Sequence, residues 1–305
     1  MLKLIVRRLM VSALVVVVVS VIAFSLVYLS GDPAVAMAGE NASAADIEAI
    51  RTDYGFDKPL YVQYEAWVDN VLHGNFGRSY FLREPVSTII EQHFPVTATL
   101  GLSALAFALL LSVPLGILAA LRPNSLIDRI ALSIAVAGQA MPSFLFGLGL
   151  IYVFGVQLRW LPFSGNASWK SYILPAIALG YYATPILMRL TRSGMLDALQ
   201  SDHVRTARAY GLSAPRVVLK HALRHAIMPV LALSAVQLGF MLGGSIIIET
   251  VFSMNGLGYL AWTSIQRSDL QVIQAILLII ACLYALLTLL ADLLNAFLDP
   301  RLRKQ

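Results

Sequence analysis

Residues 9–29 read LMVSALVVVVVSVIAFSLVYL and contain no charged side chain. An α-helix rises about 1.5 Å per residue, so this stretch is long enough to cross the roughly 30 Å hydrocarbon core of a bilayer. Lys3, Arg7 and Arg8 precede it, as in a signal peptide, but the apolar stretch is longer than the core of a typical signal peptide. We therefore expect an uncleaved transmembrane helix near the start of the chain.

Five further uncharged windows follow, each long enough to span a membrane as a helix. They cover residues 97–121, 130–158, 171–188, 226–248 and 270–291. Pro175 and Pro185 predict kinks in the shortest of them. Hydrophobic residues make up 58% of the chain and charged residues 13%, a composition that excludes a water-soluble globular protein. The sequence predicts an all-α integral membrane protein with six transmembrane helices.

Lysine and arginine are distributed unevenly between alternate loops. Fifteen of the 22 fall on the side that holds both termini and residues 189–224, and seven fall on the other side. Because the side rich in Lys and Arg is usually cytoplasmic, we expect both termini in the cytoplasm. The same bias explains the net charge of +5 without a nucleic-acid partner. Cys282 is the only cysteine, so no intrachain disulfide can form.

The windows divide the chain into four parts. We expect the N-terminal end and first transmembrane helix in residues 1–30, an extracytoplasmic loop domain in 31–95, a five-helix core in 96–298 and a cytoplasmic tail in 299–305. In the outer loop, Ser43 can cap one short helix, Pro59 can begin a second that ends before Gly74, and Pro85 can begin a third. These helices either lie on the membrane surface, over the outer mouth of a pathway, or form a packed connector.

Residues 196–224 form the polar element between the fourth and fifth windows. Leu196, Leu199, Val204, Ala207 and Tyr210 give a helix one loosely apolar side. Gly211 suits a left-handed helix stop, Ser213 can cap the next helix, and Pro215 lies in its first turn. We expect a helix, a glycine turn and a helix that dock on another protein, with small residues allowing close approach and arginines bonding to it. Contact with anionic lipid headgroups is the main alternative, and a DNA-reading helix pair a remote one.

Several short motifs carry a family resemblance. Arg205-Thr206-Ala207 followed by Gly211 occupies the positions of a Glu-Ala-Ala-x-x-x-Gly signature, with Arg in place of Glu. The Ile-x-Leu-Pro ending of that signature is not kept at its normal spacing, and Pro229 is the proline nearest to its place. The other motifs, in chain order, are Gly31-Asp32-Pro33, Gly77-Arg78-Ser79, Glu249-Thr250-Val251-Phe252-Ser253 with Gly256-Leu257-Gly258, and Leu298-Asp299-Pro300-Arg301. In this order they resemble the inner-membrane permeases of ABC importers, in particular the dipeptide, oligopeptide and nickel permease branch.

The resemblance implies a type I importer permease in the cytoplasmic membrane of a bacterium or archaeon. Its expected partners are a second homologous permease, two cytoplasmic ATPase subunits, an extracytoplasmic solute-binding protein and membrane lipid. The residues expected to couple to the ATPase are Asp202, Arg205, Thr206, Ala207, Arg208, Ala209, Gly211, Leu212 and Ser213. The chain has no Gly-Lys dipeptide and hence no phosphate-binding loop, so we expect no bound cofactor, and ATP and Mg²⁺ on the partner subunits.

Peptides are the leading substrate class that the resemblance implies, and nickel or a nickel chelate is the alternative. Gln139, Ser143, Gln237 and Glu249 are candidates to line the pathway, although the first three could instead bridge helices and Glu249 could bond to the turn after it.

Gly239 and Gly243 offer a close-packing face, either for the second permease or within this chain. No metal site is expected at His221 and His225, because Lys220 and Arg224 adjoin them. The alternative outside the ABC importers is an autonomous secondary transporter or channel. The lack of ionisable groups in the middle of the predicted membrane helices argues against ion-driven transport.

Overall fold

The computed structural model describes residues 2–29, 31–38, 42–53, 55–137 and 140–298. Apart from one isolated bridge between Arg78 and Pro85, the regular structure of these residues is helical. The main helices are α1 (Leu2–Leu29), α2 (Pro33–Ala38), α3 (Ala44–Asp53), α4 (Leu60–Leu72), α5 (Val86–Leu121), α6 (Leu126–Ala137), α7 (Ser143–Leu150), α8 (Ile173–Gly180), α9 (Thr184–Gln200), α10 (Asp202–Ala209), α11 (Ala214–Arg216), α12 (Leu223–Val251), α13 (Leu257–Gln266) and α14 (Leu270–Leu298). Short 3₁₀ or π segments connect some of them: η1 (Ile151–Gln157), η2 (Trp169–Tyr172), η3 (Tyr181–Ala183) and η4 (Val217–Ala222).

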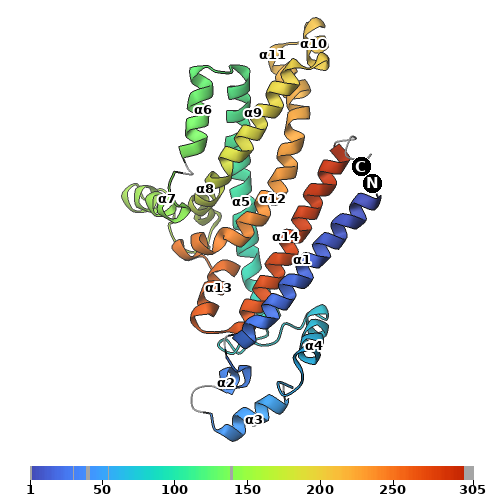
Figure 1. Cartoon of the computed structure of the whole chain (residues 1–305). Helices are drawn as coiled ribbons and strands as arrows, with labels where there is room; N and C mark the ends of the chain where they lie inside the picture. Colours follow the sequence, from blue (N-terminus) through green and yellow to red (C-terminus); the bar gives the residue numbers. More distant parts are fainter. Residues whose placement is uncertain (1, 30, 39–41, 54, 138–139, 299–305) are drawn as a thin grey trace.

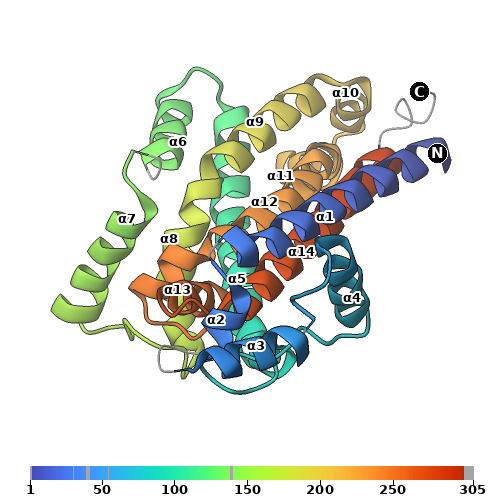
Figure 2. The ribbon, with the colours of Figure 1, turned by 60° about the horizontal axis from the view of Figure 1, so that its bottom comes forward.

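The long helices form a bundle with two different ends (Figure 1). Helices α10 and α11 protrude at one end, and the start of α1 and the end of α14 lie toward that same end. Helices α2 and α3 lie at the opposite end, where the turned view also places them together (Figure 2). We call these the α10 end and the α3 end. The arrangement matches the expected loop alternation, in which both termini lie on the side of residues 189–224.

Five helical stretches of the described residues are long and apolar enough to cross a membrane. They are Val6–Tyr28, Val86–Leu121, Trp169–Gln200, Ala214–Val251 and Leu270–Leu294. The all-α membrane fold is therefore confirmed. One window differs, since the expected single helix over 130–158 is divided into α6 and a shorter apolar helix, Ser143–Gln157.

Pro142 accounts for part of this break. Its backbone is extended, with φ −58° and ψ 141°, and it occupies the N-cap position of α7. Proline also disfavours helical geometry in the residue before it, so Met141 cannot easily continue α6. A single straight span over 130–158 was the wrong expectation, and the count of six transmembrane helices stays a prediction. Gln139 lies outside the described residues.

The outer loop contains two of the three expected helices in the expected places. Ser43 and Asp46 cap α3 reciprocally, because the Asp46 N–H donates to Ser43 Oγ at 3.3 Å and the Ser43 N–H donates to Asp46 Oδ2 at 3.1 Å. Pro59 precedes α4. The third helix is not separate, because the turns after Pro85 belong to α5, which continues through Pro95 into the second window. The helix that was expected as the third of the outer loop is therefore the first part of α5, and the boundary of the loop domain at residue 95 stays a prediction.

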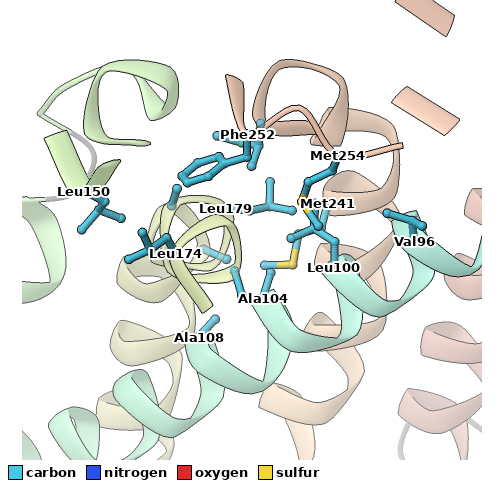
Figure 3. Packing of buried hydrophobic residues seen from close by; sticks show 14 of the residues in the cluster. Val96, Leu100, Ala104, Ala108, Leu150, Leu174, Leu179, Met241, Phe252 and Met254 are labelled. Atoms are coloured by element: carbon cyan, nitrogen blue, oxygen red, sulfur yellow. The ribbon is translucent and has the colours of Figure 1, made fainter. Parts of the chain in front are cut away.

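The central core is formed by α5, α8, α9 and α12 (Figure 3). Leu100, Ala104 and Ala108 of α5 face Leu174 and Leu179 of α8. The two backbones approach so closely at Gly180 that a Cβ atom there would lie 2.2 Å from the carbonyl oxygen of Ala104. This contact fixes α8 against the middle of the bundle.

The small residues of α12 pack inside this chain. A Cβ atom at Gly239 would lie 2.7 Å from the Tyr284 ring, and one at Gly243 would lie 3.7 Å from Ile280, both on α14. Of the two alternatives for this glycine pair, the structure shows packing within the chain. At Gly244, the next residue, a Cβ atom would have no neighbour within 4 Å among the described residues, so this glycine faces away from α14.

A buried ion pair joins α6 to α9. The Arg192 guanidinium donates to both carboxylate oxygens of Asp128, at 2.8 and 2.6 Å, and the Asp128 side chain is only 4% exposed. The hydrogen bonds from Arg192 hold the pKa of Asp128 below its usual value, with a further lowering from the N–H of Asn124. The ion pair thus fixes α6 against α9, although α6 and α7 do not form one continuous helix.

Asp128→Asn is expected to lower the melting temperature of the purified protein by roughly 5 °C or more, because it leaves the partly buried Arg192 guanidinium beside a neutral amide. Since the folded-state pKa of Asp128 is lowered, its stabilising contribution is complete above the pKa of the unfolded chain and is lost as the pH falls through the folded-state value. The melting temperatures of wild type and variant should therefore converge on acidification. Asp197→Asn, on the exposed side of α9, is the matched control, and an equal loss in both variants would contradict the assignment.

Candidate coupling surface and pathway residues

The coupling candidates lie on α10 and the turn that follows it, at the protruding end of the bundle (Figure 1). The chain leaves α9 at Ser201, whose extended backbone, with ψ 153°, turns α10 away from the axis of α9. The expected single helix through Leu196 and Tyr210 is therefore two helices. α10 is a separate, short element that lies across the ends of its longer neighbours.

Two apolar side chains anchor α10. Val204 is 0% exposed and Ala207 is 5% exposed, and both pack in a cluster with Ala120 of α5, Met195 of α9 and Ala226 of α12. Ala207 was expected to face a partner protein, but the structure turns it toward the bundle. Val204 and Ala207 thus join α10 to the same apolar cluster as residues of α5, α9 and α12.

The opposite side of α10 and the following turn are exposed and positively charged. The outward residues of the expected set are Asp202, Arg205, Thr206, Arg208, Ala209, Gly211 and Ser213, and Leu212 is half-buried. Arg205 lies 3.6 Å from Asp202, with both side chains at least 80% exposed, so this ion pair contributes little to stability. Arg205 and Arg208 therefore remain available to bond to a partner.

The turn after α10 has the geometry expected of a glycine stop. Gly211 has φ +74°, and its N–H donates to the carbonyl of Arg208 at 2.9 Å. Added side-chain atoms would have space, because no atom lies within 4 Å of a Cβ built at Gly211. The requirement for glycine is thus conformational. Ser213 occupies the N-cap position of α11, but no hydrogen bond from its side chain caps the helix, contrary to expectation.

One contact at this surface could not be predicted from the sequence. The rings of His203 on α10 and His225 on α12 lie 4.5 Å apart, centroid to centroid. They lie on two different helices, 22 residues apart in sequence and on opposite sides of the Gly211 turn, so no pattern within one helix could have paired them. The contact adds a second attachment between α10 and α12.

Glu249 does not line an open pathway in this structure. The residue is fully buried; its carboxylate accepts hydrogen bonds from the Thr97 hydroxyl at 2.7 Å and from the Tyr259 N–H at 2.9 Å. The Thr97 hydroxyl in turn accepts the N–H of Leu257 at 2.7 Å. Glu249 and Thr97 together cap the start of α13. Of the two alternatives for Glu249, the hydrogen bonds in this structure are therefore those of a residue that bonds to the segment after its own helix.

Glu249→Ala is expected to reduce the amount of folded protein strongly, because it leaves the Thr97 hydroxyl and the Tyr259 N–H of α13 without their acceptor. Glu249→Gln should cost less, since an amide oxygen can still accept one of the two bonds. Uptake by the remaining folded Glu249→Gln protein should show an unchanged KM. A large change in the KM for uptake by Glu249→Gln, at a normal level of folded protein, would instead indicate that Glu249 contacts the substrate.

The other pathway candidates are not brought together with Glu249. Ser143 is half-buried at the start of α7, and Gln237 is half-buried in α12. Twelve residues of helix separate Gln237 from Glu249, which is about 18 Å along the axis. Within the described residues no group of three His, Cys, Asp or Glu side chains is arranged to hold a metal ion.

Comparison with known proteins assigns the chain to a family. The family described as "Binding-protein-dependent transport system inner membrane component" matches residues 112–304, and its N-terminal companion family matches residues 1–101. The chain is 41% identical over 304 residues to the glutathione transport system permease protein GsiC of Escherichia coli strain K12, and equally to that of Shigella flexneri serotype 5b. Each of these alignments covers 99% of both chains.

A solved structure supports the fold alone. A chain of the MetNI methionine ABC transporter in an inward-facing conformation superposes with a TM-score of 0.57 and 18% identity, covering 69% of this chain and 96% of that one. The two family matches together extend over nearly all of the sequence, and the relatives align with it from end to end. Both findings agree with the family resemblance of the sequence motifs. The chain belongs to the inner membrane component family of binding-protein-dependent transport systems, and is a multi-pass permease subunit of an ABC importer.

Proposed function

We propose that this permease imports short peptides and that the exposed side of α10 is the surface on which an ATPase subunit acts. One observation supports the coupling role most directly. The charged side of α10 is free at the end of the bundle, while its apolar side is locked to α5, α9 and α12 through Val204 and Ala207. A displacement of α10 therefore has to move those helices with it.

The path of the motion follows from the packing. The three helices that receive α10 at one end also contribute to the central core farther along, where α5 and α12 pack against α8 and α9 continues the same helical stretch as α8. Close backbone contacts resist sliding between them; a Cβ at Gly194 of α9 would lie 3.1 Å from the Ala226 carbonyl of α12. Rotation of these helices as a unit would alternately open the pathway to each side, as importer alternation requires.

The α10 end is proposed to be cytoplasmic, together with both termini, since it carries the excess of Lys and Arg. A second permease subunit is part of the proposal, because a single bundle encloses a pathway on one side only. The α3 end would then face the solute-binding protein. ATP and Mg²⁺ would bind to the partner ATPases.

Peptides are proposed as substrates because the relatives named above are glutathione permeases, and glutathione is a tripeptide. No arrangement of metal ligands among the described residues favours nickel. The test is parallel uptake of labelled glutathione, di- and tripeptides and nickel in cells with and without this chain and its partner subunits. Loss of peptide uptake alone is expected. Loss of nickel uptake alone would reassign the cargo, and uptake that continues without ATP hydrolysis would overturn the importer mechanism.

A further inference from the structure

The described residues enclose a cavity of about 340 Å³ beside the bundle, away from the core and from α10. It lies between the last turns of α1, helix α4, the start of α14 and the loop that contains Phe76 and Tyr80. A cavity of this volume, lined mainly by aromatic and apolar groups with a few polar ones, is typical of small-molecule sites.

The lining is unusual in its balance of groups. Six aromatic side chains contribute to it: Phe24, Tyr28, Phe56, Trp67, Phe76 and Tyr80. Among the described residues that line the cavity, Lys58 is the only charged one, and none carries a carboxylate. The Lys58 ammonium forms no ion pair among the described residues, and its side chain lies over Gly55 at the cavity wall.

The walls also leave one polar atom without a partner. The Gln271 amide donates to the Tyr80 hydroxyl at 2.8 Å, but its Oε1 atom is buried and makes no hydrogen bond. The neighbouring amides are mostly occupied, since Gln63 donates to the Lys58 carbonyl at 2.7 Å and Gln274 donates to the Ala23 carbonyl at 3.0 Å. An occupant would thus find a largely apolar space and one cation, since the buried Gln271 Oε1 lies within the wall.

The position of the cavity favours an occupant from the bilayer. The side chains of α1 just before it, Val17, Val18, Val21 and Ile22, are 45% to 54% exposed and apolar, as expected of a helix that faces lipid. The cavity begins at Phe24, one turn or less farther along, on the part of α1 that Tyr64 and Trp67 of α4 cover. It therefore adjoins the lipid-facing stretch of α1, where a molecule with a hydrocarbon chain and a phosphate would be the nearest occupant.

We propose that this cavity binds one membrane phospholipid, with acyl chain against the aromatic wall and phosphate toward Lys58. Bound lipid would fill the space between α4 and α1 and hold the outer domain on the bundle. Anionic lipids are expected to bind more tightly than zwitterionic ones, because the charge that the described lining residues carry is the positive one of Lys58.

Trp67 provides the measurement, since it lies in the cavity wall. Full-length protein that retains only this tryptophan (Trp160→Phe, Trp169→Phe, Trp262→Phe) is titrated in detergent with phosphatidylglycerol carrying brominated acyl chains. Saturable quenching of Trp67 is expected. The control is a protein that retains only Trp262, a residue of α13 that is 45% exposed. This control should show only weak, non-saturating quenching.

Variants separate a bound lipid from general contact with the micelle. Lys58→Gln should weaken the saturable phase about fivefold for the anionic lipid, and Lys170→Gln, a charge control outside the cavity, should leave it unchanged. Ala66→Phe, which fills the cavity from α4, should remove the phase while circular dichroism stays unchanged. Equal quenching of Trp67 and Trp262, or an intact phase in Ala66→Phe, would overturn the proposal. Displacement of the lipid by glutathione or a dipeptide would assign the cavity to a soluble solute instead.

Discussion

Gly180→Val is expected to abolish accumulation of the folded permease. A Cβ atom at this position would lie 2.2 Å from the carbonyl oxygen and 3.0 Å from the carbonyl carbon of Ala104, and both are backbone atoms. No rotamer change in α5 can relieve such a contact, so α8 would have to move away from the core. Overpacking of cores ordinarily costs about 1 to 3 kcal/mol, and a clash between two helix backbones belongs at or above the top of that range.

The measurement is the yield of monodisperse protein after detergent extraction, compared with wild type. Gly149→Ala is the matched control, because Gly149 also lies in an apolar helix but has no atom within 4 Å of a Cβ built there. The control should purify at the wild-type level. Normal yield of Gly180→Val would mean that α5 and α8 do not approach as the structure describes.

Gly211→Val is expected to reduce uptake at least tenfold while the protein still inserts in the membrane. Valine is strongly disfavoured at the φ of +74° found at Gly211, so the turn would have to change its path and move α10 relative to α11. The fold should survive, because a side chain at this position meets no neighbour and the anchor of Val204 and Ala207 lies elsewhere.

Gly211→Asn distinguishes the effect of a changed backbone conformation from the effect of merely replacing glycine. Asparagine tolerates the left-handed region far better than valine does. It should retain most of the uptake at the same protein level. ATP hydrolysis by the assembled transporter is the second readout, and in Gly211→Val it should no longer respond to substrate. Wild-type uptake by Gly211→Val would remove the coupling role from this turn.

The sequence was informative wherever a local rule decides the structure. A bilayer requires long uncharged helices, so residues 9–29 and four other windows lie in long helices. A left-handed turn favours glycine, so Gly211 could be assigned from its position between two helical patterns. Ser43 with Asp46, and Pro59, likewise marked helix starts that the structure contains.

The sequence was uninformative where distant residues meet. Asp128 pairs with Arg192 across 64 positions and Thr97 with Glu249 across 152, and neither pair has a local signature. The inward orientation of Ala207 depends on the break at Ser201, which changes the helical face that every later residue presents. The division of residues 130–158 was signalled by Pro142, but a proline within an apolar span can equally produce only a kink.

The central claim is that the outer side of α10 contacts an ATPase subunit. The most direct test is cross-linking from Ala209→Cys in a Cys282→Ser background, using a cysteine-reactive photoactivated reagent on the assembled transporter. An adduct with the ATPase subunit that changes with bound nucleotide is the expected result, while Leu72→Cys, 79% exposed on α4 toward the other end, should give none. Adducts of Ala209→Cys with lipid alone would show that the positively charged surface of α10 serves the membrane, and would contradict the account.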